Sequence, residues 1–179
     1  MTTCRTGMAI AALLGVSLLG ACGGSGSQET SDSGAAASAP AAEETVLANG
    51  MTPKEQIELR QGELKKMGKA FKTISDQLKA GEPDMAAIQA AAASVPEISA
   101  DMDTWFPEGS GPESGEKTDA LPVIWTDRTD FDEKLANFHT AAAALATTAE
   151  GGDLAAIKEA FGTTGGACKS CHEKFRADD

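Results

Sequence analysis

Two cysteines and a histidine stand together near the end of the chain, in the run Cys168-Lys169-Ser170-Cys171-His172. Two thiols at this spacing can add to the two vinyl groups of one porphyrin, and the adjacent imidazole can then bind the iron as an axial ligand. On a helix, Cys168 and His172 are four residues apart and therefore lie on one face. The spacing predicts one covalently attached c-type haem, with His172 as the metal ligand.

The same pair of thiols also suits a zinc site, a redox-active dithiol or two buried small residues. A zinc site needs a further pair of ligands. The only other cysteines, Cys4 and Cys22, lie in a segment with the pattern of a targeting signal. Covalent haem is therefore the favoured interpretation.

Residues 1–21 have the pattern of a bacterial secretory signal of the lipoprotein type. Arg5 precedes an apolar stretch, Met8 to Leu19, that is too short to span a membrane, and small residues follow it. The run Leu19-Gly20-Ala21-Cys22 resembles a lipobox, where bacterial lipoproteins are cut and the new terminal cysteine is acylated. A plain signal peptide with an incidental cysteine is the alternative. We expect an exported protein on the periplasmic side, held at a bacterial membrane by lipid on Cys22.

The composition changes after the signal. Residues 22–50 are rich in Gly, Ser, Ala, Glu and Pro and hold almost no large apolar side chain, which predicts a disordered tether that begins with the acylated cysteine. Residues 51–179 are long enough for one domain with one core. The sequence thus predicts a single folded domain on a flexible, lipid-anchored leader.

Within the domain, glycines and prolines separate four segments whose apolar residues recur at helical spacing. A long loop from 107 to 122 divides the two pairs, Pro96 is expected to kink or split the second segment, and Asp153 is placed to cap the fourth. No segment alternates with period two. The pattern predicts an all-α fold, an antiparallel four-helix bundle that holds its haem near the C-terminus. The segments are expected at about 53–81, 85–102, 127–151 and 154–175.

Arg60 stands in the first helix at a core position, four residues before Leu64. An unpaired charge facing a core costs several kcal/mol by order of magnitude. Haem propionates would supply a partner, because a guanidinium binds a carboxylate with two hydrogen bonds. The alternative is an arginine that extends from the edge of the core to water.

Four pieces of this sequence, in their order along the chain, resemble the cytochrome c' family over about residues 55–177. The resemblance implies that Arg60 and Gln61 lie against the haem and its propionates, and that Asp119 lies at the haem edge. It also implies that Arg176 lies near the iron ligand and that Leu64 covers the distal face of the iron. The four pieces are Leu59-Arg60-Gln61, Trp105-Phe106-Pro107-Glu108-Gly109, Ala120-Leu121-Pro122-Val123-Ile124-Trp125, and Gly166-Ala167-Cys168-Lys169-Ser170-Cys171-His172 with Phe175-Arg176.

Leu64 decides which function the resemblance implies. Leucine has no lone pair, so the iron is expected to be five-coordinate and high-spin, with an apolar pocket for nitric oxide or carbon monoxide and with electron transfer still open to it. The alternative is a low-spin periplasmic electron carrier in which Met67, one turn beyond Leu64, is the sixth ligand. For Met67 itself, core packing is the favoured role.

An enzyme is not expected, because peroxide or oxygen chemistry needs a distal acid or base. His139 is the only histidine besides the expected ligand, a lone histidine is more often structural or solvated, and the chain has no tyrosine.

The expected partners are a diatomic gas and a redox partner protein. The formal net charge of -12 disfavours nucleic acid and anionic lipid headgroups and suits a basic redox partner. Some family members pair through their first two helices. Small residues outside the core stripe here, such as Ala86, Ala87 and Ala90, leave room for a homodimer.

Overall fold

The computed structural model describes residues 45–178, and within them it contains helices and no β-strand. The candidate signal, Cys22 and most of the expected tether lie outside the described residues. None of the described helices is long and apolar enough to cross a membrane. The four long helices are α1 (Pro53–Lys79), α2 (Met85–Ile98), α4 (Arg128–Glu150) and α5 (Leu154–Phe175), and the short ones are η1 (Met102–Thr104), η2 (Pro112–Ser114) and α3 (Val123–Thr126).

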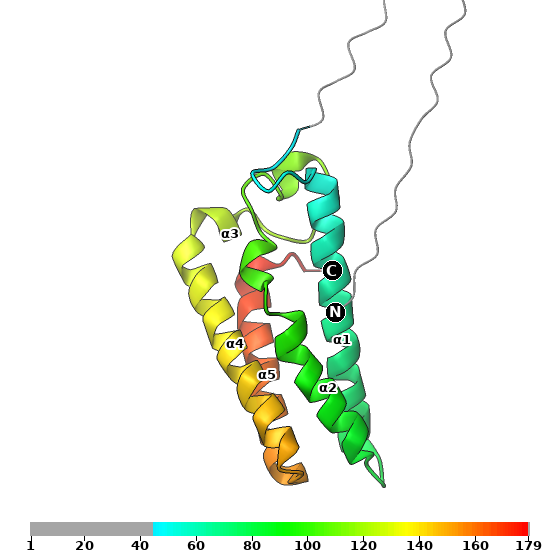
Figure 1. Ribbon diagram of the computed structural model, residues 1–179. Helices are drawn as coiled ribbons and strands as arrows, with labels where there is room; N and C mark the ends of the chain where they lie inside the picture. The colour runs from blue at the N-terminus through cyan, green and yellow to red at the C-terminus, as the bar shows by residue number, and fades with distance from the viewer. Residues whose placement is uncertain (1–44, 179) are drawn as a thin grey trace, which may run out of the picture. The chain divides into compact units, whose positions relative to one another are not determined.

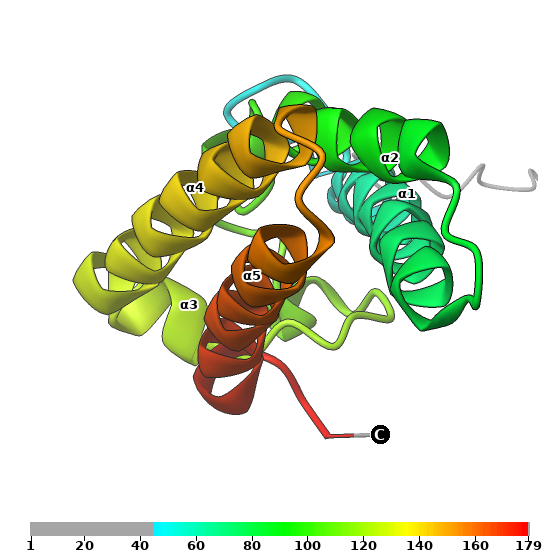
Figure 2. The same ribbon diagram turned by 90° about the horizontal axis from the view of Figure 1, so that it is seen from below.

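The long helices form the predicted antiparallel bundle. In Figure 1, α1 and α4 run downward and α2 and α5 run upward. A short turn at the bottom joins α1 to α2, and another joins α4 to α5. α1 packs on α2, α2 on α4, and α4 on α5, whereas α1 and α5 come into contact far less. Figure 2, seen from below, shows α4 beside α5 and α1 beside α2. The bundle is therefore closed on three sides and looser between α1 and α5.

Side chains fix where three of these helices begin. At α1, the hydroxyl of Thr52 accepts from the amide of Glu55 at 3.2 Å, and the Glu55 carboxylate accepts from the Thr52 amide at 2.8 Å. Asp84 caps α2, and Asp153 caps α5 by accepting from two backbone amides. The predicted cap at Asp153 is confirmed.

Pro96 lies inside α2, which continues for two residues and ends at Ile98. The split expected at Pro96 is therefore absent, because the helix runs through the proline and ends only at Ile98. Proline disturbs the turn that precedes it, and Ser99 then closes the helix by donating its amide to the Val95 carbonyl at 3.1 Å. Met102, expected on the stripe of the second helix, lies instead in η1.

The loop between the two helix pairs contains more structure than predicted. Besides η2, the short helix α3 precedes α4, where the sequence indicated only the end of a loop. At the other edge, the expected tether ends earlier than residue 50. Leu47 is buried, and its backbone forms hydrogen bonds with the backbone of residues 50 and 51. Its side chain lies so close to Gly109 that a Cβ placed on that glycine would be only 3.0 Å away from it. The folded unit therefore already includes Leu47, a few residues before the expected boundary at about residue 51.

Two apolar clusters divide the bundle along its length. The cluster near the short turns is aliphatic, with Ile74, Ile88, Leu145 and Ile157 all fully buried. The cluster at the other end is larger and aromatic, and it adjoins the two cysteines of α5. The aliphatic cluster holds the helices together, and the aromatic end carries the candidate site.

Replacing Ile88 by alanine tests this division. Ile88 is 0% exposed, so the Ile88→Ala variant is expected to lose about 2 to 5 kcal/mol in the free energy of unfolding measured with urea. The control is Leu154→Ala, since Leu154 is 38% exposed and its loss is expected to cost less than about 1 kcal/mol. The visible spectrum of the haem is expected to stay unchanged in both variants. An altered spectrum in Ile88→Ala would mean that the clusters are not independent.

Candidate haem site

A pocket opens at the aromatic end of the bundle, between α1 and α5, with about 840 Å³ of space that includes its open side. Its walls are mostly apolar, as is usual for a cofactor site. α4 supplies the back wall with Phe131, Leu135 and Phe138. The pocket thus lies between the two neighbouring long helices that contact each other least.

α5 carries the cysteine motif on the face that borders this pocket. Cys168, Cys171 and His172 all line it, so the expected common face is present. Both cysteines are half-buried and neither forms a disulfide. Lys134 of α4 fixes the residue between them, because its Nζ donates to the Ser170 hydroxyl at 2.8 Å.

The surroundings of the thiols do not suit the alternative chemistries. Burial raises the pKa of the Cys168 thiol and raises the pKa of Cys171 to about 11, whereas a redox-active dithiol needs a lowered pKa. No group of three or more potential metal ligands occurs among residues 45–178. The pKa of His172 is lowered by burial and then by the nearby Arg176 guanidinium, which favours the neutral imidazole that binds iron.

Arg60 is 2% exposed and does not extend to water, so that alternative is wrong. Its two terminal nitrogens donate to the Trp105 carbonyl, to the hydroxyl and carbonyl of Ser110, and to the Thr118 hydroxyl, at 2.9 to 3.2 Å. Its guanidinium also lies 4.7 Å from the centroid of the Phe106 ring. Burial lowers its pKa to about 10, so it remains charged at neutral pH. In this structure the loop between α2 and α4 supplies its partners, and its expected contact with a propionate stays a prediction.

The other predicted residues come to the same pocket. Gln61 lines it and donates to the Lys117 carbonyl at 3.2 Å. Asp119 and Arg176 are neighbours there, because the segment around Ala120 pairs with the end of α5. The Ala177 amide donates to the Asp119 carbonyl at 2.8 Å. The structure thus brings together all eight residues that the sequence singled out, from α1, the loop and α5.

Leu64 and Met67 are the two α1 residues that decide the coordination question. Both line the pocket. Leu64 is 38% exposed and lies at the open side, whereas Met67 is 6% exposed and packs within the aromatic cluster. His139, in contrast, is not among the lining residues.

Several residues that line the pocket were not expected from the sequence. Met102 and Thr118 line it from the irregular segment between α2 and α4, and Lys134 lines it from α4. Phe131 and Phe138 were visible as the apolar stripe of the third helix, and that stripe was the available signal. Nothing local to Lys134 or Thr118 indicated that either would face a pocket.

Comparison with known proteins identifies the family of this chain. A family model described as cytochrome c' matches residues 55–176. The cytochrome c' of Allochromatium vinosum is 37% identical over 135 residues, which are 74% of this chain and 87% of that protein. That of Rhodopseudomonas palustris is 40% identical over 123 residues, 68% of this chain and 81% of that protein.

The chain belongs to the cytochrome c' family. Members carry covalently bound haem c, and the residues of the pocket fit that group: two thiols and an imidazole border a mostly apolar pocket. Similar solved structures include a cytochrome c' described as having ligand-controlled dimer dissociation, with 36% identity and a TM-score of 0.67 over 72% of this chain and 99% of that one. The cytochrome c' of Shewanella frigidimarina has 36% identity and a TM-score of 0.66 over 70% of this chain and 97% of that one.

Replacing Arg60 by methionine tests its structural role in this cytochrome c'. The change leaves the buried Ser110 carbonyl without a donor and removes one of the two donors of the Trp105 carbonyl, which keeps its bond from Gln56. At about 1 to 3 kcal/mol for the unpaired carbonyl and about 1 kcal/mol for the lost bond, the expected loss is about 2 to 4 kcal/mol in the free energy of unfolding of the holoprotein. Lys65→Met, at an exposed position on the same helix, is the matched control. Equal unfolding midpoints for the two variants would contradict the role given to Arg60.

Proposed function

We propose that this cytochrome c' holds a five-coordinate, high-spin haem, binds nitric oxide or carbon monoxide on the face covered by Leu64, exchanges electrons with a redox partner protein, and is not an enzyme. The observation that carries the proposal is the makeup of the pocket wall from α1. The pocket-lining residues of that wall are Arg60, Gln61, Leu64 and Met67. Arg60 is bonded to the loop, and Met67 is packed in the core.

When bound, the haem iron supplies a site for a neutral diatomic ligand and for one-electron exchange. The chain's own residues set the conditions. His172 holds the iron from α5, and Cys168 and Cys171 fix the ring in place. Leu64 and the aromatic wall of α4 make the distal side poor in hydrogen-bond partners, so water binds weakly there and uncharged gases are favoured.

A solved relative supports the binding of a diatomic gas. The cytochrome c' of Alcaligenes xylosoxidans has been solved as a nitric oxide complex of a leucine-to-alanine mutant, with 30% identity and a TM-score of 0.64 over 71% of this chain and 97% of that one. That protein binds nitric oxide in the solved complex. For this chain, gas binding rests on the similarity and on Leu64.

The second candidate is a low-spin electron carrier with Met67 as the sixth ligand. Its support is that Met67 lines the same pocket, three residues from Leu64. Met67 belongs to the same buried aromatic cluster as Ala70 and Phe138. We rank this candidate second, because a ligand role would need its thioether to leave that packing.

Spectra of three proteins separate the candidates. The ferric wild type is expected to show a high-spin spectrum without a methionine-to-iron charge-transfer band, and the ferrous form is expected to bind carbon monoxide. Met67→Leu is expected to leave both results unchanged. Leu64→Ala is expected to speed carbon monoxide binding, because it removes bulk from the face that the ligand approaches. A charge-transfer band that Met67→Leu abolishes, with no carbon monoxide binding in the wild type, would establish the second candidate.

We also propose that the protein is exported and held by lipid on Cys22 at the periplasmic side of a bacterial membrane. The support is the pattern of residues 1–22, together with a haem type that is attached outside the cytoplasm. Cys22→Ser is expected to move the protein from the membrane fraction to the soluble fraction and to abolish labelling with a fatty acid. Cys4→Ser is the matched control and should change neither. Membrane retention of the Cys22→Ser protein would overturn the lipid anchor.

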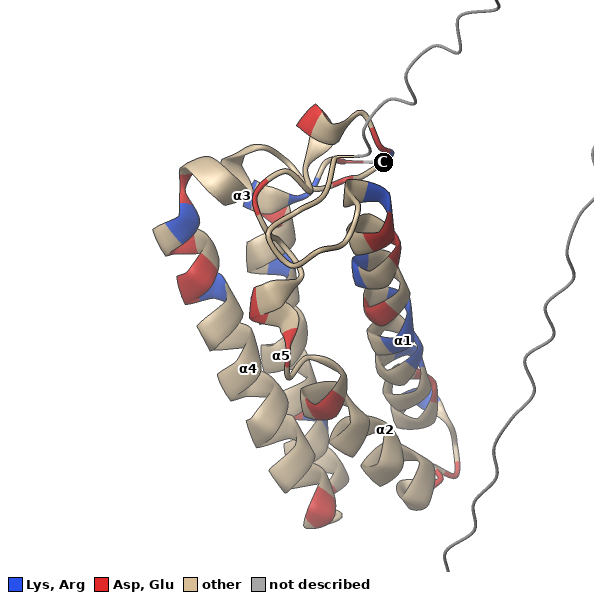
Figure 3. Ribbon diagram, turned by 45° about the horizontal axis from the view of Figure 1, so that its top comes forward, with Lys and Arg blue, Asp and Glu red and all other residues tan. Residues whose placement is uncertain are grey.

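The expected homodimer also stays a proposal. α2 carries no charged residue from Met85 to Pro96, and this helix is largely free of charge colours in Figure 3. Ala86, Ala90 and Ala93 are exposed on it, and Leu59 of α1 is 40% exposed. These surfaces suit pairing through the first two helices, and a similar solved cytochrome c' is described as having ligand-controlled dimer dissociation.

A further inference from the structure

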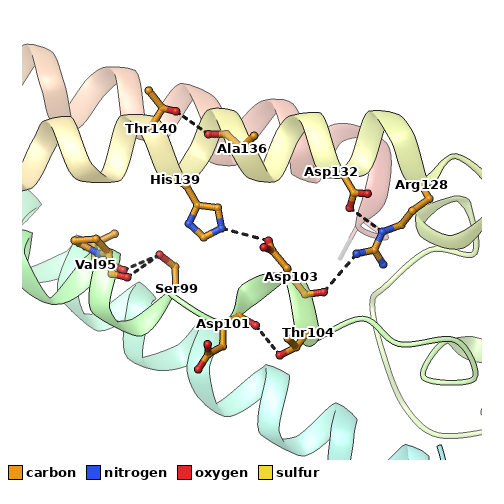
Figure 4. Close-up of polar contacts among 11 residues, drawn as sticks. Val95, Ser99, Asp101, Asp103, Thr104, Arg128, Asp132, Ala136, His139 and Thr140 are labelled. Atoms are coloured by element: carbon orange, nitrogen blue, oxygen red, sulfur yellow. Dashed lines mark hydrogen bonds and ion pairs between the residues drawn. The ribbon is translucent and has the colours of Figure 1, made fainter. Parts of the chain in front are cut away.

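His139 of α4 faces Asp103 of η1 across the junction between these two elements (Figure 4). The imidazole Nε2 lies 3.5 Å from the Asp103 carboxylate, beyond ordinary hydrogen-bond geometry, and this buried nitrogen has no other partner within the described part of the chain. A buried nitrogen without a partner is costly while the ring is neutral. Once protonated, the same nitrogen carries a hydrogen toward a carboxylate, and the contact becomes charge-assisted.

This contact joins two walls of the haem pocket. Phe138, which precedes His139, lines the pocket from α4, and Met102, which precedes Asp103, lines it from η1. Trp105 follows directly after η1, and its carbonyl accepts from both Gln56 and Arg60. The contact therefore lies one residue along the chain from each of two pocket-lining side chains, Met102 and Phe138.

A second link across the same junction does not depend on pH. Arg128 of α4 donates to the Phe106 carbonyl at 3.1 Å and to the Asp103 carbonyl at 3.4 Å. It is also paired with Asp132 on its own helix at 2.7 Å. Arginine keeps its charge at all physiological pH values. Arg128 therefore holds η1 against α4 independently of pH, and the contact between His139 and Asp103 adds to this.

The remaining charged groups near the junction leave Asp103 as the partner of His139. On the η1 side, Asp101 directs its carboxylate away from His139 in Figure 4. On α4, Asp132 is occupied by Arg128. Ser99, at the end of α2, is neutral and bonds to the carbonyls of Val95 and Pro96. The response of the junction to pH thus depends on one imidazole and one carboxylate.

We propose that His139 is a positioning residue for ligand binding: its protonation pairs it with Asp103 and fixes η1 against α4, so that the pocket wall is tighter at low pH and looser at high pH. Ligand access is therefore expected to be greater when the imidazole is neutral than when it is protonated. The ligand part of this proposal rests on the proposed function, whereas the tightening of η1 does not.

The test compares wild type, Asp103→Asn, His139→Gln and the control Asp101→Asn as full-length holoproteins. Hydrogen exchange of the backbone amides at residues 102–106 reports how firmly η1 is held. Comparing proteins at equal pH removes the intrinsic effect of pH on exchange. At about pH 5, Asp103→Asn and His139→Gln are expected to exchange about two- to fivefold faster than wild type, in keeping with the strength of partly exposed ion pairs. At about pH 8 all four proteins are expected to agree.

Carbon monoxide binding to the ferrous proteins gives the second readout. The wild type and Asp101→Asn are expected to bind more slowly at low pH, while Asp103→Asn and His139→Gln keep the faster rate at both values. Exchange rates that do not differ between wild type and Asp103→Asn at low pH would overturn the proposal. So would an equal response in Asp101→Asn. Absence of carbon monoxide binding at every pH would instead contradict the proposed function, and the exchange data would still decide the role of His139.

Discussion

The buried guanidinium of Arg60 is the interaction on which the haem end of this bundle depends. Removing a charge from water is expensive, and Arg60 is compensated by four hydrogen bonds and by the face of Phe106. All of its partners lie in the segment between α2 and α4. One side chain of α1 thus fixes the long connection that closes the end of the bundle, and the neighbouring positions Gln61 and Leu64 are left to face the pocket.

The same constraint explains why the pocket lies where it does. At the lower end, α1 and α5 are brought together by Phe71 and Phe161, whose ring centroids are 5.4 Å apart, and the aliphatic cluster closes the bundle. At the upper end, the partners of Arg60 hold the loop against α1, and the pairing of Ala120 with Arg176 holds the same loop against the end of α5. At the upper end the two helices are therefore bridged by the loop and not by direct contact with each other. A flat cofactor attached to α5 fits between them.

The bundle and the cysteine motif were predictable from sequence because both depend on local spacing. The four apolar stripes and the common face of Cys168 and His172 follow from the helical repeat, and the cap at Asp153 follows from an aspartate placed just before a helix. What could not be predicted depends on residues far apart in the chain. The acceptors for Arg60 lie 45 or more positions away, the burial of Leu47 needs Gly109, and Lys134 meets Ser170 across two helices. The expected break of the second helix at the proline is absent, since α2 runs through Pro96 and ends at Ile98.

The central claim is a haem held by His172 with no side chain bound to the opposite face of the iron. Electron paramagnetic resonance of the ferric holoprotein at neutral pH tests it most directly, because the signal reports the spin state of the iron itself. The account predicts a high-spin ferric signal that is the same in wild type and in Met67→Leu. A low-spin signal in the wild type that becomes high-spin in Met67→Leu would contradict it.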